Sequence, residues 1–346
     1  MQPAPNRPTS PAELHPDELV KLAPDRLAVR VRSITYAAEN INLYEVVDPH
    51  GGELPPFTAG SHIDLCFRDL RIRQYSLCNS PMERHRYVFA VQFEPQGRGG
   101  SKTIFERVHV GRTLVVSAPR NHFQLARDAQ RHLFIAGGIG ITPIMAMIHA
   151  LRASGGEFEL HYCTRSAERT AFLDDLAPER EAGRAIVYHD GGDPARGLDL
   201  QALLRVQRPG THVYCCGPQP FMRAVREASA QWPRGSVHFE YFAPDDAKGA
   251  EAATAPPSES SSFQVRLARS GVTIDVPGNK SILESLRDHG YDVASSCESG
   301  VCGTCRTHYL EGVPEHRDFV LDEDERAHEV LICCARSRTP VLVLDL

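Results

Sequence analysis

The sequence contains no apolar stretch of about 18 residues or more, so it predicts no membrane-spanning helix. It also has no excess of positive charge: 38 Lys and Arg stand against 44 Asp and Glu, and the net charge of −6 argues against nucleic acid as a partner. No apolar segment of the signal-peptide kind follows Met1. We therefore expect a cytoplasmic protein whose thiols stay reduced or bind metal.

The periodicity of the hydrophobic residues changes several times along the 346-residue chain, which indicates a multidomain protein. Short strand-like segments predict an antiparallel β-barrel, and alternating strands and helices predict a doubly wound α/β domain with a parallel sheet. Ser281 and Glu284 form a predicted capping box at the start of a helix near the C-terminus. The predicted regions are a loose N-terminal tail (1–24), the β-barrel (25–125), the α/β domain (126–243), a linker (244–262) and an α+β domain (263–346).

The ten cysteines include a group with the spacing of an iron–sulfur site. Cys297, Cys302 and Cys305 form a C-x4-C-x2-C pattern, and the pair Cys333 and Cys334 follows downstream. This spacing is typical of plant-type [2Fe-2S] sites, in which four thiolates bind two irons. Zinc is the alternative, but zinc ribbons usually pair two C-x2-C knuckles, and this chain has only one. We therefore predict a plant-type ferredoxin domain, and we call residues 297–305 the cluster loop.

Two motifs in the predicted barrel favour a flavin phosphate site. Arg73-Gln74-Tyr75-Ser76 offers an arginine, an aromatic ring and a hydroxyl, which suit a phosphate, an isoalloxazine face and a ring nitrogen. Gly97-Arg98-Gly99-Gly100-Ser101 leads into a predicted helix at 102–107, where backbone amides face an anion and Ser101 can serve as N-cap or phosphate ligand. Each motif alone could be an ordinary strand surface or a glycine turn, but together they favour the flavin.

Two further motifs follow strands of the predicted parallel sheet. Ala136-Gly137-Gly138-Ile139-Gly140-Ile141-Thr142-Pro143 joins a buried strand to a helix, with Thr142 suited to the N-cap and Pro143 to the first helical position. Its glycines allow a pyrophosphate to approach the backbone closely, although the string is not the G-x-G-x-x-G fingerprint. Cys215-Cys216-Gly217-Pro218 ends a later strand, at the sheet edge where ligands bind in such folds.

Over nearly the whole chain, these motifs resemble those of the phthalate dioxygenase reductase family, which is similar to ferredoxin–NADP reductases with a ferredoxin fused at the C-terminus. The cluster loop is similar in particular to that of vanillate O-demethylase-type reductase subunits. The resemblance implies FMN rather than FAD, NADH as the electron donor, and a separate Rieske oxygenase as the partner. It implies that a hydride passes from NADH to FMN and that single electrons then pass through a [2Fe-2S] cluster to the oxygenase, since a flavin can divide an electron pair.

The resemblance also implies roles for individual residues. Ser76 lies near the reactive N5 of the flavin, Cys216 lies beside the nicotinamide, and Phe242 covers the flavin, with Phe239 as an alternative. The implied cofactor-binding residues are Arg73, Gln74, Tyr75 and Ser76 for the flavin, Arg98, Gly99, Gly100 and Ser101 for its phosphate, and Gly137, Gly138, Gly140, Thr142, Cys216, Gly217 and Pro218 for NADH. The implied cluster ligands are Cys297, Cys302, Cys305 and Cys333, because the family's fourth ligand precedes a strand ending Leu-Asp-Leu, which favours Cys333 over Cys334.

Several alternatives stay open. Arg165 and Arg169 follow a predicted strand and could bind the 2′-phosphate of NADPH or be ordinary solvated arginines; we predict NADH. A reductase for a di-iron hydroxylase, a free-standing flavin reductase and a non-catalytic electron carrier are the other functions. The C-terminal place of the cluster weighs against the first, and the nucleotide and flavin motifs weigh against the last. We expect a monomer.

Overall fold

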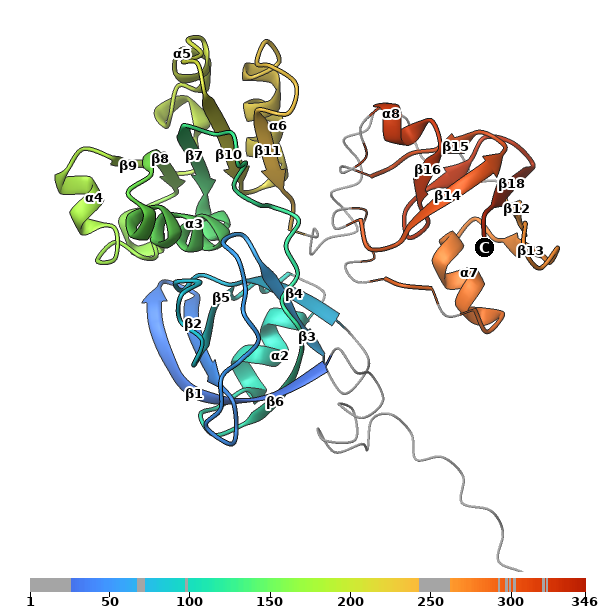
Figure 1. Ribbon diagram of the computed structural model, residues 1–346, viewed down its shortest axis with the longest axis horizontal. Helices are drawn as coiled ribbons and strands as arrows, with labels where there is room; N and C mark the ends of the chain where they lie inside the picture. The colour runs from blue at the N-terminus through green and yellow to red at the C-terminus, as the bar shows by residue number, and fades with distance from the viewer. Residues whose placement is uncertain are drawn as a thin grey trace, which may run out of the picture. The chain divides into compact units, whose positions relative to one another are not determined.

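The computed structural model describes residues 26–66, 72–96, 99–242, 262–291, 293–295, 298, 300, 303–318, 321 and 323–346. The predicted tail, nearly all of the predicted linker, and Gly97, Arg98, Cys297 and Cys302 lie outside these residues. The chain forms two compact units, Met1–Glu240 and Tyr241–Leu346 (Figure 1). Within the described part of the chain, no helix combines the length and the hydropathy needed to cross a bilayer.

The first unit begins with a six-stranded antiparallel barrel, in which the strands follow the order β4-β3-β6-β1-β2-β5. An isolated antiparallel bridge between Leu77, just after β4, and Phe89 on β5 joins the two outer strands and closes the sheet. Alternate apolar residues of the strands fill the interior, as a half-buried sheet requires. The elements are β1 (Arg26–Ala38), β2 (Ile41–Val47), β3 (His62–Cys66), β4 (Ile72–Ser76), β5 (Tyr87–Gln92), α2 (Gly100–Arg107) and β6 (Thr113–Ser117).

A five-stranded parallel sheet forms the rest of the first unit, in the order β11-β10-β7-β8-β9. The chain reverses its direction of winding between β7 and β10, so the ends of these two strands define a topological switch point. The strands are β7 (Arg131–Gly137), β8 (Glu157–Thr164), β9 (Ala185–His189), β10 (Thr211–Cys216) and β11 (Val237–Glu240). The helices are η2 (Gly138–Gly140), α3 (Ile141–Ser154), η3 (Ala167–Arg169), α4 (Ala177–Glu181), η4 (Pro194–Arg196), α5 (Leu200–Leu204) and α6 (Gln219–Ala228).

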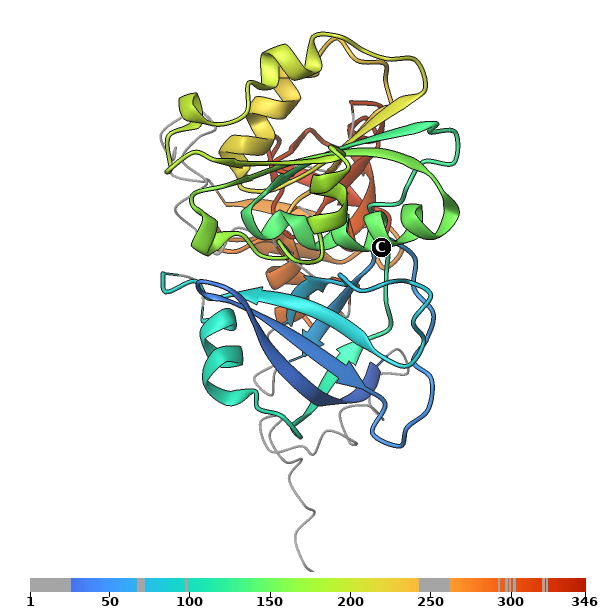
Figure 2. The ribbon, with the colours of Figure 1, turned by 90° about the vertical axis from the view of Figure 1, so that its left-hand side faces the viewer.

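The barrel and the parallel sheet are separate layers joined by polar and backbone contacts (Figure 2). Arg120, in the connecting segment, exchanges two backbone hydrogen bonds with His62 on β3. Further along the same segment, the backbone N–H of Ala126 donates to the Tyr214 hydroxyl at 2.8 Å. The connection is therefore tied to both sheets, which restricts their relative motion.

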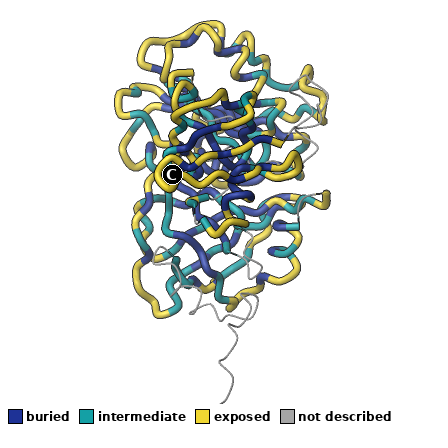
Figure 3. The backbone as a smooth tube through the Cα atoms, turned by 90° about the vertical axis from the view of Figure 1, so that its right-hand side faces the viewer, coloured by how far each residue is buried: buried dark blue, intermediate teal, exposed yellow. Residues whose placement is uncertain are grey.

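The second unit contains a five-stranded mixed sheet in the order β13-β12-β18-β14-β16, with β18 parallel to β12 and antiparallel to β14. Buried and exposed residues alternate along β12 and β13, and the tube in Figure 3 shows buried segments in dark blue and exposed segments in yellow. The predicted capping box is present at the start of α7, where Ser281 and Glu284 bond reciprocally. The elements are β12 (Phe263–Leu267), β13 (Thr273–Val276), α7 (Ile282–Asp288), β14 (Arg306–Glu311), β15 (Pro314–Glu315), α8 (Glu323–Arg326), β16 (Glu329–Leu331), β17 (Arg336–Ser337) and β18 (Val341–Leu344).

The three predicted architectures are confirmed: an antiparallel barrel, a doubly wound α/β sheet and a C-terminal α+β fold. The domain boundaries remain predictions. The last strand of the parallel sheet, β11, ends at Glu240, so Phe242 lies beyond the sheet.

Candidate functional site

Three strand ends from two sheets meet in the first unit. Ser76 is the last residue of β4, and its hydroxyl donates a hydrogen bond to Glu240 Oε2 at 3.4 Å. Glu240 ends β11, where it pairs in register with Cys216, the last residue of β10. The sequence analysis predicted roles for Ser76 and Cys216 but none for Glu240. The one available signal was a carboxylate at the end of a strand otherwise made of apolar and aromatic residues.

The carboxyl and the thiol at this point are both uncharged at neutral pH. Burial raises the pKa of Glu240 to about 8, and the hydrogen bond from Ser76 offsets this only in part. Burial also raises the pKa of the Cys216 thiol well above its usual value, and the neighbouring Glu240 and Cys215 raise it further. The meeting point therefore offers polar atoms without a fixed negative charge, which suits an uncharged ring system.

A candidate anion site lies at the start of α2. Gly99 is the N-cap of this helix, and a Cβ added to Gly100 would lie 2.7 Å from Nε of Arg73. Arg73 therefore lies against the first turn, where the helix dipole and the free backbone amides already favour an anion. This arrangement of a guanidinium, a helix N-terminus and a position without Cβ fits a flavin phosphate. Arg98, the other predicted cation, lies outside the described residues.

Ser101 does not cap α2, contrary to one of its two predicted roles. The helix begins at Gly100, so Ser101 lies inside the first turn, where it is buried. Its hydroxyl accepts a hydrogen bond from the backbone N–H of Glu94 at 3.0 Å. The glycine at position 99 adopts the left-handed conformation at the cap, so no side-chain cap is needed there.

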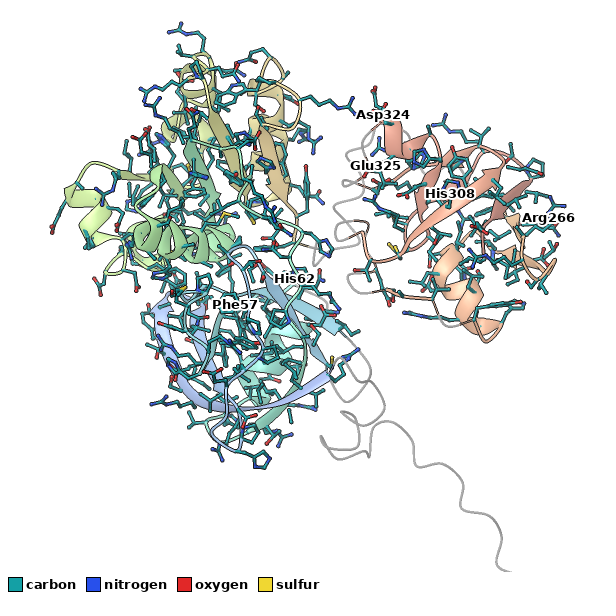
Figure 4. The ribbon with its side chains drawn as sticks, viewed as in Figure 1. Phe57, His62, Arg266, His308, Asp324 and Glu325 are labelled. Atoms are coloured by element: carbon teal, nitrogen blue, oxygen red, sulfur yellow. The ribbon has the colours of Figure 1, made fainter. Side chains whose placement is uncertain are left out.

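Tyr75 and Gln74 lie on opposite faces of β4, as alternation along a strand requires. The Tyr75 ring packs against Phe89 in the barrel interior, with ring centroids 5.4 Å apart. The Gln74 side-chain nitrogen lies 3.1 Å from His62 Nε2 and 3.3 Å from Asp64 Oδ1 on the neighbouring strand (His62 is labelled in Figure 4). The Gln74 amide thus has partners within the hairpin, and its predicted role in flavin binding remains a prediction.

The glycine motif after β7 lies at the topological switch point. A Cβ on Gly140 would lie 2.2 Å from the Cys216 carbonyl oxygen, and a Cβ on Gly137 would lie 2.9 Å from Cδ of Pro218. These two glycines therefore allow the loops after β7 and β10 to pack together. Gly138 has open space where its Cβ would be, so the backbone at Gly138 is accessible to a diphosphate.

Thr142 is not the N-cap of α3, and this prediction was wrong. The helix begins at Ile141 after Gly140, which carries no capping side chain. The buried Thr142 hydroxyl donates instead to the Ile139 carbonyl at 3.0 Å and so stabilises the glycine turn from inside. The short helical turn η2 extends the helix start backwards by three residues, which moves the cap upstream.

Arg169, one of the two candidate 2′-phosphate ligands, has a partner in the barrel. Its Nε lies 3.1 Å from Glu39 Oε2, and the Glu39 backbone N–H donates to the Glu168 carbonyl at 2.7 Å. The guanidinium is therefore already neutralised by a carboxylate from another sheet.

Two of the predicted cluster ligands are brought together in the second unit. Cys305 immediately precedes β14 and Cys333 follows β16, and these strands pair antiparallel. The Ile332 backbone N–H donates to the Cys305 carbonyl at 3.4 Å, and both cysteines are buried in the same apolar core. In the described part of the cluster loop, Glu298, Gly300 and Gly303 have positive φ, as a tight loop around a cluster requires. This geometry fits a [2Fe-2S] cluster, with Cys297 and Cys302 outside the described residues.

The two aromatic candidates differ in their surroundings. The Phe239 ring lies on β11, and the Arg226 guanidinium lies 4.8 Å from its centre. Phe242 is partly buried and follows the strand. The predicted flavin-covering role of Phe242 remains a prediction.

Comparison with known proteins agrees with these sites. Residues 265–338 match the family described as "2Fe-2S iron-sulfur cluster binding domain", and residues 134–227 match "Oxidoreductase NAD-binding domain". The chain is 48% identical to the tert-butanol monooxygenase / tert-amyl alcohol desaturase reductase subunit of Aquincola tertiaricarbonis, over 92% of this chain and 96% of that protein. It is 45% identical to the phthalate 4,5-dioxygenase oxygenase reductase subunit of Pseudomonas putida, over the same shares.

Among solved structures, phthalate dioxygenase reductase matches with a TM-score of 0.71 and 41% identity, over 96% of this chain and 100% of that one. That structure is described as transferring electrons from pyridine nucleotides to [2Fe-2S]. The predicted resemblance is confirmed, and so are the predicted [2Fe-2S] cluster, FMN and a nicotinamide coenzyme. The chain belongs to the phthalate dioxygenase reductase family of iron–sulfur flavoprotein oxidoreductases.

Proposed function

We propose that this chain is the NADH-dependent reductase component of a two-component Rieske oxygenase system. The observation that carries the proposal is the meeting of Ser76, Glu240 and Cys216 at one edge of the parallel sheet, where the Gly138 backbone is accessible. When bound, FMN supplies the conversion of a two-electron hydride transfer into single-electron transfers, and a [2Fe-2S] cluster supplies one-electron carriage.

The barrel residues hold and orient the flavin. Arg73 and the first-turn amides of α2 bind its phosphate, which anchors one end of the molecule. The Ser76 hydroxyl, at the end of β4, offers a hydrogen bond to the reacting edge of the ring. The Tyr75 ring packs against Phe89. This contact holds β4 in place, so the strand is already positioned before the flavin binds.

Glu240 and Cys216 set the charge and the solvent access of the reacting edge. Because burial keeps the Glu240 carboxyl protonated at neutral pH, its Oε2 accepts the hydrogen bond from the Ser76 hydroxyl, 3.4 Å away, without placing a negative charge there. The uncharged Cys216 side chain fills the end of β10 and excludes water from the place proposed for the nicotinamide. Glu240 and Cys216 would thus keep the place proposed for hydride transfer free of a nearby anion and of water.

The proposed coenzyme is NADH rather than NADPH. A 2′-phosphate needs an unengaged cation after the second strand of the parallel sheet. Of the two candidate arginines, Arg169 is engaged with Glu39 and Arg165 is exposed, so only Arg165 could bind such a phosphate, which favours a ribose without it. Steady-state rates with the two coenzymes test this, and a higher kcat/KM with NADPH would contradict it.

The proposed electron acceptor is an oxygenase component, and the substrate is a property of that component. One relative's name refers to tert-butanol and the other's to phthalate, although both are reductase subunits. The proposed reaction of the partner is the demethylation or dihydroxylation of an aromatic compound. We further propose that the reductase acts as a cytoplasmic monomer, which light scattering and cell fractionation would test.

The decisive experiment uses the purified full-length chain. We expect orange-brown protein that contains iron, acid-labile sulfide and FMN, and that bleaches when NADH is added under argon. Adding a Rieske oxygenase with its substrate should accelerate NADH oxidation and yield oxidised product. Colourless protein, or bound zinc in place of iron, would exclude the proposed function.

A further inference from the structure

A buried carboxylate lies in the second unit at a position that none of the sequence motifs includes. Asp318 follows β15 and precedes α8, and its side chain is only 1% exposed. A buried carboxylate is stable only if hydrogen bonds or opposite charges compensate for its lost hydration. The residues around Asp318 supply both.

The compensation comes from the short helix α8 and its flanking loop. The Leu321 backbone N–H donates to Asp318 Oδ1 at 2.8 Å. Nη2 of Arg326 lies 3.5 Å from the same oxygen and donates to the Asp318 backbone carbonyl at 2.9 Å. His316 Nδ1 lies 3.6 Å from Oδ2. Arg326 therefore holds both the side chain and the backbone of Asp318.

The backbone of Asp318 in turn lies against the cluster loop. Gly300 has a φ of +73°, and a Cβ at this position would lie 3.2 Å from Cα of Asp318 and 2.7 Å from Sγ of Cys334. Gly300 is thus enclosed between Asp318 and Cys334, with no room for a side chain. A shift of the Asp318 backbone would therefore change the packing around Gly300 in the cluster loop.

The same helix is bonded to the other end of the loop. Arg306 follows Cys305, and its Nη1 donates to Glu325 Oε1 on α8 at 2.9 Å (Glu325 is labelled in Figure 4). Helix α8 therefore connects, through Glu325 and Arg326, the residue after one predicted cluster ligand with the carboxylate that supports Gly300.

We propose that Asp318, held by Arg326, is a positioning residue for the cluster loop and that this ion pair sets part of the reduction potential of the cluster. The proposal rests on the [2Fe-2S] site of the proposed function. Reduction adds an electron to the cluster, so a nearby negative charge opposes it and a nearby positive charge favours it. Removing the negative charge of Asp318 and removing the positive charge of Arg326 should therefore shift the reduction potential in opposite directions.

The test measures the midpoint potential of the cluster and its EPR spectrum in full-length D318N and R326Q. D318N keeps the side-chain size and the acceptor for Leu321, and should raise the equilibrium constant for reduction about threefold to tenfold; tenfold corresponds to about 59 mV for one electron. R326Q should lower this equilibrium constant by a similar factor. In the double variant, the equilibrium constant should lie within about threefold of the wild-type value. Each single variant should also change the EPR g values.

Matched controls are R266Q and E311Q, which break an exposed ion pair of 3.1 Å in the same unit. Arg266 lies at the other end of the unit from Asp324 on α8 (Figure 4). These variants should keep the wild-type potential and spectrum. Loss of iron from D318N, with FMN retained and R266Q intact, would also support the positioning role.

Two results would overturn the proposal: unchanged potentials and EPR spectra in D318N and R326Q, or shifts of the same sign in both variants with iron retained. Failure of the proposed function is distinguishable from both, because it would appear as wild-type protein without iron and sulfide.

Discussion

At the scale of single residues, Glu240 has the most unusual environment in the first unit. It ends a strand of the parallel sheet, yet its carboxyl accepts a hydrogen bond from the barrel residue Ser76. Its protonation state therefore decides whether a negative charge faces the site that we propose for hydride transfer. This makes the pH dependence of the reductive step a direct measure of its role.

We expect FMN reduction by NADH to be fast below pH 8 and to slow above it, because Glu240, with a pKa of about 8, ionises there. E240Q cannot ionise, so it should keep the rate within about threefold of wild type at pH 7 and lose the decline at high pH. Stopped-flow measurements from pH 6 to pH 9.5 test this. An identical decline in E240Q would assign the titration to another group.

The same carboxyl makes a prediction about stability. The pKa rises from 4.5 to about 8 on folding, so between these values the folded state binds more protons than the unfolded state. The free energy of unfolding of the FMN-free protein should therefore fall as pH rises through this window. E240Q should reduce this decrease by about 3.5 kcal/mol between pH 5 and pH 8, as measured in urea titrations at the two pH values. If the free energy of unfolding of E240Q falls with pH as much as that of the wild type, the pH dependence does not come from Glu240.

The adjacent cysteines of the second unit should respond differently to substitution. C333A should lose iron and sulfide, because Cys333 follows the strand that pairs next to Cys305. C334A should retain the cluster, because the Cys334 thiol donates to the Leu331 carbonyl at 3.6 Å and packs against Gly300. Iron and sulfide assays of the two variants show which cysteine is the cluster ligand, with C66A on β3 as a control. A cluster that survives C333A but not C334A would reverse the assignment.

At the scale of elements, the capping box of α7 should be a local source of stability. S281A removes the hydroxyl that accepts from the Glu284 N–H at 3.1 Å, and should lower the free energy of unfolding by about 1 kcal/mol. S281T keeps a hydroxyl, so its free energy of unfolding should fall by less than that of S281A. Thermal unfolding followed by circular dichroism and by cluster absorbance tests this. Equal losses in both variants would show that packing, rather than capping, is responsible.

The sequence predicted elements well where the signal is local. The capping box and the alternating strands depend on neighbouring residues, so periodicity and residue type suffice. The caps at Thr142 and Ser101 were misplaced because glycine backbones at the helix starts provide the turn without a side chain. Glu240 was missed because its partner Ser76 is 164 residues away, and only the folded sheets bring the two together. Asp318 was missed for another reason: its partners Leu321 and Arg326 are near in sequence but form no known motif, and its contact with Gly300 depends on the fold.

At the scale of the whole molecule, the ion pair between Glu39 and Arg169 links the barrel to the parallel sheet. Because both side chains are exposed, the pair should contribute little to stability. E39Q should nevertheless raise kcat/KM for NADPH about threefold to tenfold, since it frees Arg169 for the 2′-phosphate, and should leave NADH turnover within about twofold. The E39Q/R169Q double variant is the control, and its kcat/KM for NADPH should not show the increase expected of E39Q. Unchanged coenzyme preference in E39Q would mean that Arg169 lies out of reach of the ribose.

The position of β18 has a consequence for how the protein matures. This strand, Val341–Leu344, lies between β12 and β14 in the middle of the second sheet, although the cysteines of the cluster loop precede it in the chain. A ribosome therefore makes the thiolates before it makes the strand that completes the sheet around them. The machinery that delivers iron and sulfide must therefore act after β18 has been made, and nascent chains stalled before Val341 should acquire no iron.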